Sequence, residues 1–157
     1  MKDPHILIRQ ASLEDLHEIV PLFDAYRQFY GRSSDCAAAT VFLRERLFKK
    51  DSLIFVAQDN AALQAGRLVG FVQIYISLSS IGLKPAWILN DLYVLPSVRS
   101  RGVGFALAEA ASAHAVAENI KIMRVVVQKD NPAARKLYEK LGYQRDNKSD
   151  HYALHIG

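Results

Sequence analysis

The sequence is poor in cysteine, contains no long apolar run and carries no concentrated block of positive charge. Its single cysteine, Cys36, cannot form a disulfide within the chain, and one cysteine excludes a zinc site built from several. No apolar run approaches the roughly 20 residues of a membrane-spanning helix. The first residues lead directly into a short apolar segment and not into the long apolar core of a signal peptide. We therefore expect a cytoplasmic protein that has no membrane partner.

The excess of positive charge is small and dispersed. Twenty Lys and Arg residues stand against 16 Asp and Glu residues, which gives a formal charge of +4 and an isoelectric point near 9.2. A nucleic-acid-binding domain gathers its basic residues into a stripe or patch, whereas here only residues 44–50 and the pair Arg99 and Arg101 form tight groups. The five histidines show no spacing typical of a metal site. We expect neither a nucleic acid nor a metal ion as a ligand.

The chain has the length of one domain, which we place at residues 1–157. Apolar periodicity and turn residues predict strands at 5–10, 53–57, 66–77, 87–95 and 122–127, a terminal strand pair within 144–156, and helices at about 12–30, 34–50, 103–119 and 131–141. A hairpin connection is expected at 60–64, and the strand 122–127 is apolar enough to be central. Ser12 with Asp15 three residues later is expected to form a variant of the capping box, and Asp130 or Asn131 is expected to cap the last helix. This order predicts an α/β (α+β) sandwich whose sheet is antiparallel at first and parallel in its later half.

The stretch from Leu89 to Ala117 reads as a strand, a glycine loop and a helix. The N–H groups at a helix N-terminus have no intrahelical partner and lie at the positive end of the helix dipole, so such a loop can bind an anion. A P-loop is excluded because Phe105 and Ala106 follow the last glycine where Lys and Ser or Thr are required. A dinucleotide fingerprint is excluded because Leu107 stands where its third glycine would be. The remaining prediction is a site for a different phosphate ligand.

Two motifs identify that ligand by resemblance. Residues 99–104 read R-x-x-G-x-G after a strand ending in Val-Leu-Pro, and residues 131–143 read N-x-x-A-x-x-x-Y-x-x-x-G-Y. Together they closely resemble the two signatures of the GNAT superfamily of N-acetyltransferases. The resemblance implies a mixed central sheet of about six to seven strands flanked by about four helices, in which the strands 87–95 and 122–127 splay apart around the pantetheine arm of acetyl-CoA.

The resemblance also assigns residues to the co-substrate acetyl-CoA. Backbone groups of Leu92, Tyr93 and Val94 would bind pantetheine in the manner of an added strand. The implied cofactor-binding residues are Leu92, Tyr93, Val94, Arg99, Ser100, Arg101, Gly102, Val103, Gly104, Asn131 and Ala134. Many members carry glycine where this chain has Ser100, and a serine fits the expected loop if its φ is negative.

Two residues are candidates for proton transfer. Tyr138 stands about two turns after Asn131 on one helix face, where a hydroxyl could protonate the departing CoA thiolate; the alternative is an amphipathic core tyrosine. The attacking amine must be neutral, and Asp91 is the candidate for its base or its binding carboxylate; the alternative is a structural carboxylate that caps nearby backbone. Asp91 alternates with Leu92 along the strand, so it is expected to share a face with Leu89 and Tyr93.

The acceptor is less clearly encoded than the donor. Aromatic side chains of the first helix, together with two others, resemble the acceptor side of small-amine and polyamine enzymes of the family and can hold a cation. These substrate-binding candidates are Tyr26, Tyr30, Tyr75 and Trp87. In the diamine acetyltransferases an acidic pair stands at positions 90 and 91, but here Asn90 breaks it.

The sequence thus predicts an N-acetyltransferase that moves an acetyl group from acetyl-CoA to a primary amine by direct transfer in a ternary complex. The expected acceptor is a small molecule such as a polyamine or diamine. The alternatives are acetylation of a protein N-terminus or lysine, or a non-catalytic CoA-binding regulatory domain. The resemblance further implies that a homodimer can form.

Overall fold

The computed structural model describes residues 3–61 and 66–156. The chain divides into two compact units, residues 1–126 and 127–157, and each is described by itself. Most of the hairpin connection predicted at 60–64 lies outside the described residues.

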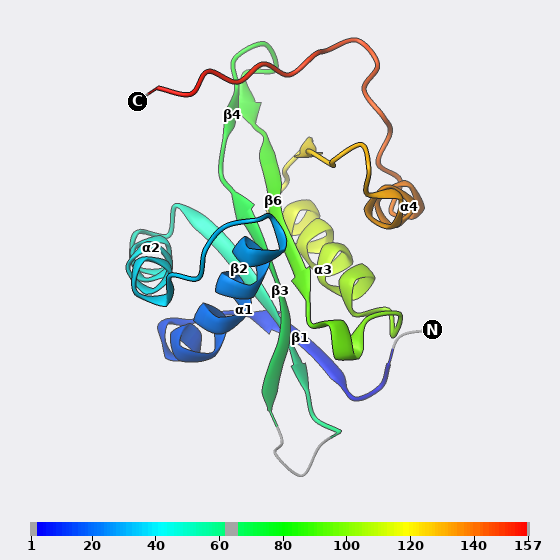
Figure 1. Cartoon of the computed structure of the whole chain (residues 1–157). Helices are drawn as coiled ribbons and strands as arrows, with labels where there is room; N and C mark the ends of the chain where they lie inside the picture. Colours follow the sequence, from blue (N-terminus) through cyan, green and yellow to red (C-terminus); the bar gives the residue numbers. More distant parts are fainter. Residues whose placement is uncertain (1–2, 62–65, 157) are drawn as a thin grey trace. The chain divides into compact units, whose positions relative to one another are not determined.

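The first unit is built on a five-stranded sheet with the order β1-β2-β3-β6-β7 (Figure 1). Its strands are β1 (Ile6–Gln10), β2 (Ser52–Asp59), β3 (Arg67–Tyr75), β6 (Trp87–Val94) and β7 (Met123–Val125). The first four pair antiparallel and β6 pairs parallel with β7. A second, two-stranded sheet joins β4 (Leu78–Ser79) and β5 (Lys84–Pro85). The predicted mixed α/β class is confirmed, and so is the change from antiparallel to parallel pairing.

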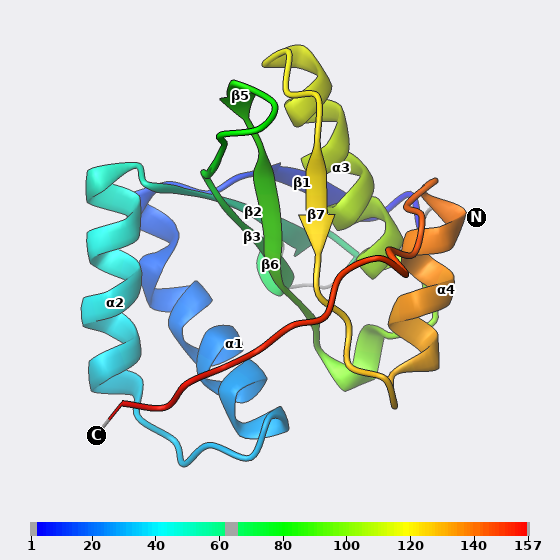
Figure 2. The same ribbon diagram turned by 90° about the horizontal axis from the view of Figure 1, so that it is seen from above.

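Helices cover both faces of this sheet. α1 (Leu16–Phe29) and α2 (Cys36–Lys49) lie on one face and α3 (Val103–Ala117) on the other (Figure 2). The first helix follows a short 3-10 turn, η1 (Leu13–Asp15), at which Ser12 and Asp15 form the predicted capping box. The core under α1 and α2 includes Ile19, Leu43 and Phe71, which are fully buried. Burial of such side chains is the main stabilising term of the unit.

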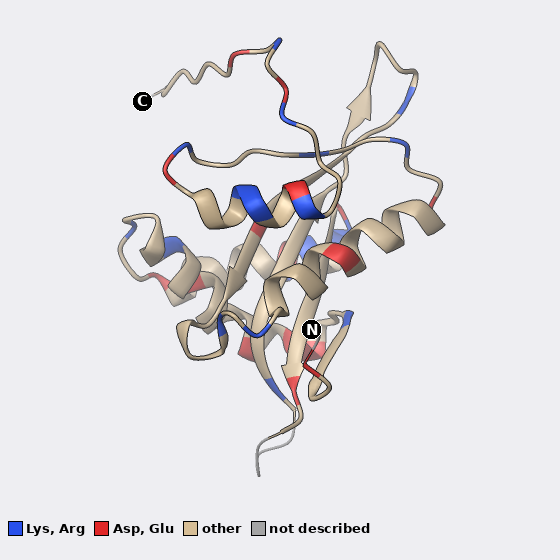
Figure 3. Ribbon diagram, turned by 90° about the vertical axis from the view of Figure 1, so that its right-hand side faces the viewer, with Lys and Arg blue, Asp and Glu red and all other residues tan. Residues whose placement is uncertain are grey.

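Helix α3 packs through small side chains and carries little charge. Ala108, Ala111 and Ala115 are buried together with Leu107, so the helix axis lies close to the sheet. Glu109 is its only Asp, Glu, Lys or Arg residue. Figure 3 shows how the charged residues are distributed over the ribbon. The first turn of α3 contains no acidic side chain, so the first turn itself places no negative charge next to an anion at the helix N-terminus.

The second unit contains α4 (Pro132–Lys140) followed by an extended tail. Asn131 caps the helix by accepting a hydrogen bond from Ala134 N at 3.0 Å, and Gly142 ends the segment with a φ of +88°. The predicted pair of strands within 144–156 is wrong, because the structure has no strand there. An isolated two-stranded hairpin is marginally stable in water, and Tyr152 and Leu154 of this segment are exposed.

The strand predicted at 122–127 is shorter than expected and lies at the sheet edge. β7 contains three residues, which pair with Trp87, Ile88 and Leu89 of β6. It was expected to be central, but the strand pair that would have extended the sheet beyond it does not form. Pairing between β6 and β7 therefore ends at Leu89, and the second half of β6 continues without it.

Candidate active site

Beyond Leu89, where pairing with β7 ends, β6 presents backbone groups along the edge that faces away from β3. Leu95 N donates to Val69 O at 2.9 Å, so this part of β6 is paired with β3 in the antiparallel register. Because the direction of pairing alternates along an antiparallel strand, Tyr93 pairs toward β3, whereas Leu92 and Val94 direct their backbone groups to the opposite edge. An extended ligand chain can add to such an edge as a strand does. The backbone groups of Leu92 and Val94 lie on such an edge, and the roles of Leu92, Tyr93 and Val94 toward pantetheine stay predictions.

The loop after β6 leads into the N-terminus of α3. A 3-10 turn, η2 (Pro96–Val98), precedes it, and Gly102 at the helix N-cap has a φ of +79°. Intrahelical bonding begins with Ala106 N, which donates to Gly102 O at 2.9 Å. The N–H groups of Val103 and Gly104 therefore lie in the first turn, before the helix bonds its own amides. The loop thus presents first-turn N–H groups without intrahelical partners, and its binding of a pyrophosphate stays a prediction.

Ser100 does not have the negative φ that was expected of it. Its φ is +63°, in the left-handed region. This is the position at which many family members carry glycine, and glycine adopts such a conformation without the steric cost that a Cβ brings. The loop therefore keeps the shape that glycine would give it and carries local strain instead.

Replacing Ser100 with glycine is expected to stabilise the protein by about 0.5–1 kcal/mol, because it removes the cost of a left-handed non-glycine residue. Denaturant unfolding measures the change. Ser112→Gly is the matched control; Ser112 lies within α3, so this substitution is expected to destabilise by about 0.5–1 kcal/mol. Destabilisation by both substitutions would refute the strain at Ser100.

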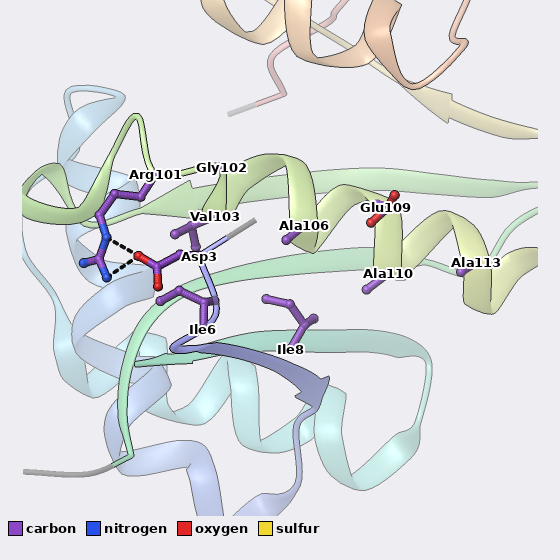
Figure 4. Close-up of a pocket in the computed structure, with 10 residues that line it drawn as sticks. All are labelled: Asp3, Ile6, Ile8, Arg101, Gly102, Val103, Ala106, Glu109, Ala110 and Ala113. Atoms are coloured by element: carbon purple, nitrogen blue, oxygen red, sulfur yellow. Dashed lines mark hydrogen bonds and ion pairs between the residues drawn. The ribbon is translucent and has the colours of Figure 1, made fainter. Parts of the chain in front are cut away.

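The two arginines of the loop have different partners. Arg99 Nε donates to Val94 O at 3.0 Å, and its guanidinium lies 5.7 Å from the Tyr93 ring centroid and 5.8 Å from that of Phe29. Arg101 instead forms an ion pair with Asp3, shown in Figure 4, and a second one with Asp59. The sequence predicted that both arginines bind phosphate, but in the structure Arg101 already pairs with two carboxylates.

A cavity of about 460 Å³ lies beside this ion cluster, between β1 and α3 (Figure 4). Asp3, Arg101 and Glu109 contribute its charged groups, and side chains such as Ile6 and Ala110 line the rest. The cavity shares Gly102 and Val103 with the loop.

On the other face of the sheet, a buried carboxylate is held by neutral donors. Asp91 is 6% exposed and accepts hydrogen bonds from Gln73 Nε2 at 2.8 Å and from Asn90 Nδ2 at 3.1 Å. The Tyr26 phenol, whose pKa burial raises, lies close enough to Asp91 for the carboxylate to raise that pKa further. Ser52 Oγ donates to Gln73 Oε1 at 3.1 Å, which directs the amide NH₂ of Gln73 toward Asp91.

Asp91 forms none of the ion pairs found among the described residues. The buried Asp15 and Asp24, by contrast, pair with Arg9 and Arg27. A buried carboxylate needs hydrogen bonds and a countercharge. Asp91 has the hydrogen bonds, and a cationic ligand would supply the countercharge.

The tyrosines near Asp91 remain neutral phenols. Burial, followed by the charge of Asp91, raises the pKa of both Tyr26 and Tyr75 above its ordinary value. Tyr30 contacts Tyr26 edge-on with ring centroids 5.0 Å apart, and Gln73 Nε2 lies 3.4 Å from the Tyr75 hydroxyl. Three of the four predicted acceptor residues are thus linked to Asp91, two directly through charge and Tyr30 through Tyr26.

Trp87 is not part of this cluster. Its ring stacks on His114 of α3, at 5.8 Å between centroids. A register shift lies between the pairs Gln73–Asp91 and Ile74–Leu89, so Asn90 is an extra residue in β6. Such a bulge reverses the faces of the residues before it. Trp87 and Leu89 therefore face α3, while Asp91 faces α1, and the expectation that Leu89 and Asp91 share a face is wrong.

The second unit holds the other motif residues. Of the two residues expected to cap α4, Asp130 and Asn131, it is Asn131 that does so, and Tyr138 lies on the same helix. The Tyr138 ring contacts that of Tyr143 edge-on at 5.4 Å, and Tyr143 N donates to Tyr138 O. The roles of Asn131, Ala134 and Tyr138 toward acetyl-CoA stay predictions.

Sequence reasoning did not assign a role to Gln73, Ser52, Asp3 or Asp59. Gln73 gave a usable signal, because it is a lone amide within the apolar run of β3 and is fully buried. Asp3 and Asp59 gave none, since both are 42 or more positions from Arg101 in the chain. Only the fold brings them together.

Over residues 3–61 and 66–156, no helix is long and apolar enough to cross a membrane. In the same part of the chain, no group of three or more His, Cys, Asp or Glu side chains is arranged to bind a metal ion.

Comparison with known proteins gives a consistent result. Residues 18–143 match the model of the acetyltransferase (GNAT) family. The chain is 40% identical over 149 residues to the uncharacterised N-acetyltransferase YhfO of Bacillus subtilis, covering 95% of this chain and 97% of that protein.

Solved structures agree in fold. The crystal structure of a probable acetyltransferase has a TM-score of 0.88 at 40% identity, covering 96% of this chain and 98% of that one. The ribosomal-protein-alanine N-acetyltransferase of Brucella melitensis biovar Abortus 2308 has a TM-score of 0.79 at 22% identity and covers 96% of this chain and 99% of that one. The second likeness bears on the fold alone.

Proposed function

The chain belongs to the acetyltransferase (GNAT) family, and from that premise we propose that it transfers an acetyl group from acetyl-CoA to a primary amine of a small cationic molecule. The observation that carries the acceptor assignment is Asp91, a buried carboxylate with neutral donors and no ion-pair partner among the described residues. An ammonium group bound there would supply the positive countercharge that the Asp91 carboxylate lacks. A polyamine or diamine is the substrate class that fits best.

The donor side follows from the loop and the free edge of β6. First-turn N–H groups of α3, from Val103 and Gly104, would bind the pyrophosphate. Backbone groups of Leu92 and Val94 would bind the pantetheine amides. When bound, acetyl-CoA supplies the acetyl thioester, from which the acetyl group passes directly to the amine within a ternary complex.

Side chains of this protein then carry out the two proton transfers, from the amine and to the CoA sulfur. Asp91 and the neutral hydroxyls of Tyr26 and Tyr75 bind and orient the amine, and Asp91 or a water bound to it removes the proton that the nitrogen must lose before attack. Aromatic rings of Tyr26 and Tyr30 accommodate the rest of a cationic chain. Tyr138 donates a proton to the CoA sulfur. A homodimer and a cytoplasmic location stay predictions from the sequence.

An amine panel at saturating acetyl-CoA is expected to give CoA release fastest with diamines or polyamines. The panel compares these with aminoglycosides, amino acids, lysine peptides and peptides with an N-terminal alanine. Intersecting initial-rate lines, obtained by varying both substrates, are the expected signature of a ternary complex. Turnover with peptides alone would mean that the acceptor is a protein and not a small molecule. Absence of turnover with every amine, despite binding of acetyl-CoA, would identify a CoA-binding regulatory domain.

A further inference from the structure

The Arg101 guanidinium is enclosed by two carboxylates from distant parts of the chain. Its Nε and Nη2 contact Asp3 Oδ2 at 2.8 and 2.6 Å, and its Nη1 contacts Asp59 Oδ2 at 3.3 Å. Asp3 precedes β1 and Asp59 ends β2, and these two strands pair at Ile6 and Asp59. The arginine is therefore fixed to the sheet (Figure 4).

The charge of this cluster does not favour a phosphate. One guanidinium with two carboxylates carries a net charge of −1. Hydrogen bonds from His5 N and from Arg101 lower the pKa of Asp3 below its ordinary value, so Asp3 is ionised at neutral pH. A ligand role for Arg101 would require it to leave two strong charge-assisted partners.

The backbone on both sides of Arg101 is in an unusual conformation. Ser100 and Gly102 both have a positive φ, +63° and +79°. A non-glycine residue keeps such a conformation only where the surrounding structure holds it. Arg101 lies between the two, and its side chain is the link from this turn to Asp3 and Asp59.

We propose that Asp3 and Asp59 are positioning residues for the co-substrate site. They hold Arg101, and through it the backbone of residues 99–104, in the shape that exposes the first-turn N–H groups of α3. Arg101 braces the loop and does not bind the phosphate. That this loop binds acetyl-CoA rests on the proposed function. That Asp3 and Asp59 hold the loop in shape through Arg101 does not.

The substitutions Asp3→Asn and Asp59→Asn, made singly and together, test the proposal by the sign of their effect. Asparagine keeps an oxygen to accept from His5 N or Ala61 N, so the local turns are preserved. Each change removes one negative charge near the loop. If Arg101 binds phosphate and the carboxylates only compete for it, CoA should bind more tightly. If the carboxylates brace the loop, CoA should bind more weakly, by about 3- to 10-fold for the double variant.

Glu118→Gln is the matched control for each single substitution, because it also removes one negative charge, at the opposite end of α3. Calorimetric titration with CoA gives the dissociation constants, and steady-state kinetics give separate KM values for acetyl-CoA and the amine. We expect the double variant to raise the KM for acetyl-CoA and to leave the KM for the amine unchanged, and the control to change neither.

Amide hydrogen exchange of the ligand-free protein provides a readout that needs neither CoA nor turnover. The double variant is expected to exchange faster at residues 100–104, with unchanged exchange in β2 and β3. Unchanged loop exchange, or tighter CoA binding, would overturn the proposal. If the wild-type protein does not bind CoA, the proposed function fails, and loop exchange still decides whether the carboxylates brace the loop.

Discussion

Replacing Asp91 with asparagine is expected to lower kcat/KM for the amine by about 100-fold or more, because a buried charge partner for the substrate is lost. Asparagine is nearly isosteric, so the change removes the charge and leaves the packing. The KM for acetyl-CoA should stay the same. Steady-state kinetics with both substrates varied measure the two effects separately.

The same variant distinguishes a functional carboxylate from a structural one. Asp91 is buried with hydrogen bonds but without an ion-pair partner among the described residues. Removing such a charge relieves the cost of its desolvation, but the new NH₂ group then faces a donor NH₂ of Gln73 or Asn90. The two effects oppose each other, so the unfolding free energy should change little while activity falls. A large loss of stability with little loss of activity would make Asp91 structural. Asp59→Asn is the matched control, and it should change the KM for acetyl-CoA instead.

Replacing Tyr138 with phenylalanine is expected to lower kcat about 100-fold, since general acid catalysis contributes roughly 10²–10⁴-fold. The substitution removes one hydroxyl and keeps the ring that packs against Tyr143. CoA binding should be unchanged, because the proton is needed only when the thiolate leaves. Single-turnover rates and calorimetric titration measure the two quantities.

Tyr143→Phe provides the control for Tyr138→Phe. It removes a hydroxyl from the other ring of the same pair, and the family motif accepts either tyrosine or phenylalanine at that position. Its kcat should equal that of the wild type. Equal rates for wild type and Tyr138→Phe would remove Tyr138 from the mechanism and leave a solvent proton in its place.

Local sequence signals predicted the parts of the fold that depend on neighbouring residues. The capping box of Ser12 and Asp15 and the cap at Asn131 form as expected. The glycine loop enters α3 at the predicted residue, Val103. Each of these features is fixed by hydrogen bonds within a few residues, so the local sequence is enough to predict it.

Features that depend on distant residues could not be predicted in the same way. The bulge at Asn90 moves Trp87 away from the acceptor cluster, and an alternating pattern alone carries no sign of it. The partners of Arg101 come from the start of the chain and the end of β2. The tail at 144–156 has the composition of strands, but a strand needs a paired edge and the tail alone does not supply one.

Transfer of an isotopically labelled acetyl group from acetyl-CoA to an amine tests the central claim most directly. The protein is incubated with the labelled co-substrate and a diamine, and the products are separated and identified by mass spectrometry. We predict that the label appears on the amine nitrogen together with an equal amount of free CoA, and that Asp91→Asn reduces both alike. If, for every amine tested, the labelled acetyl group leaves CoA no faster with the protein than without it, the central claim is wrong.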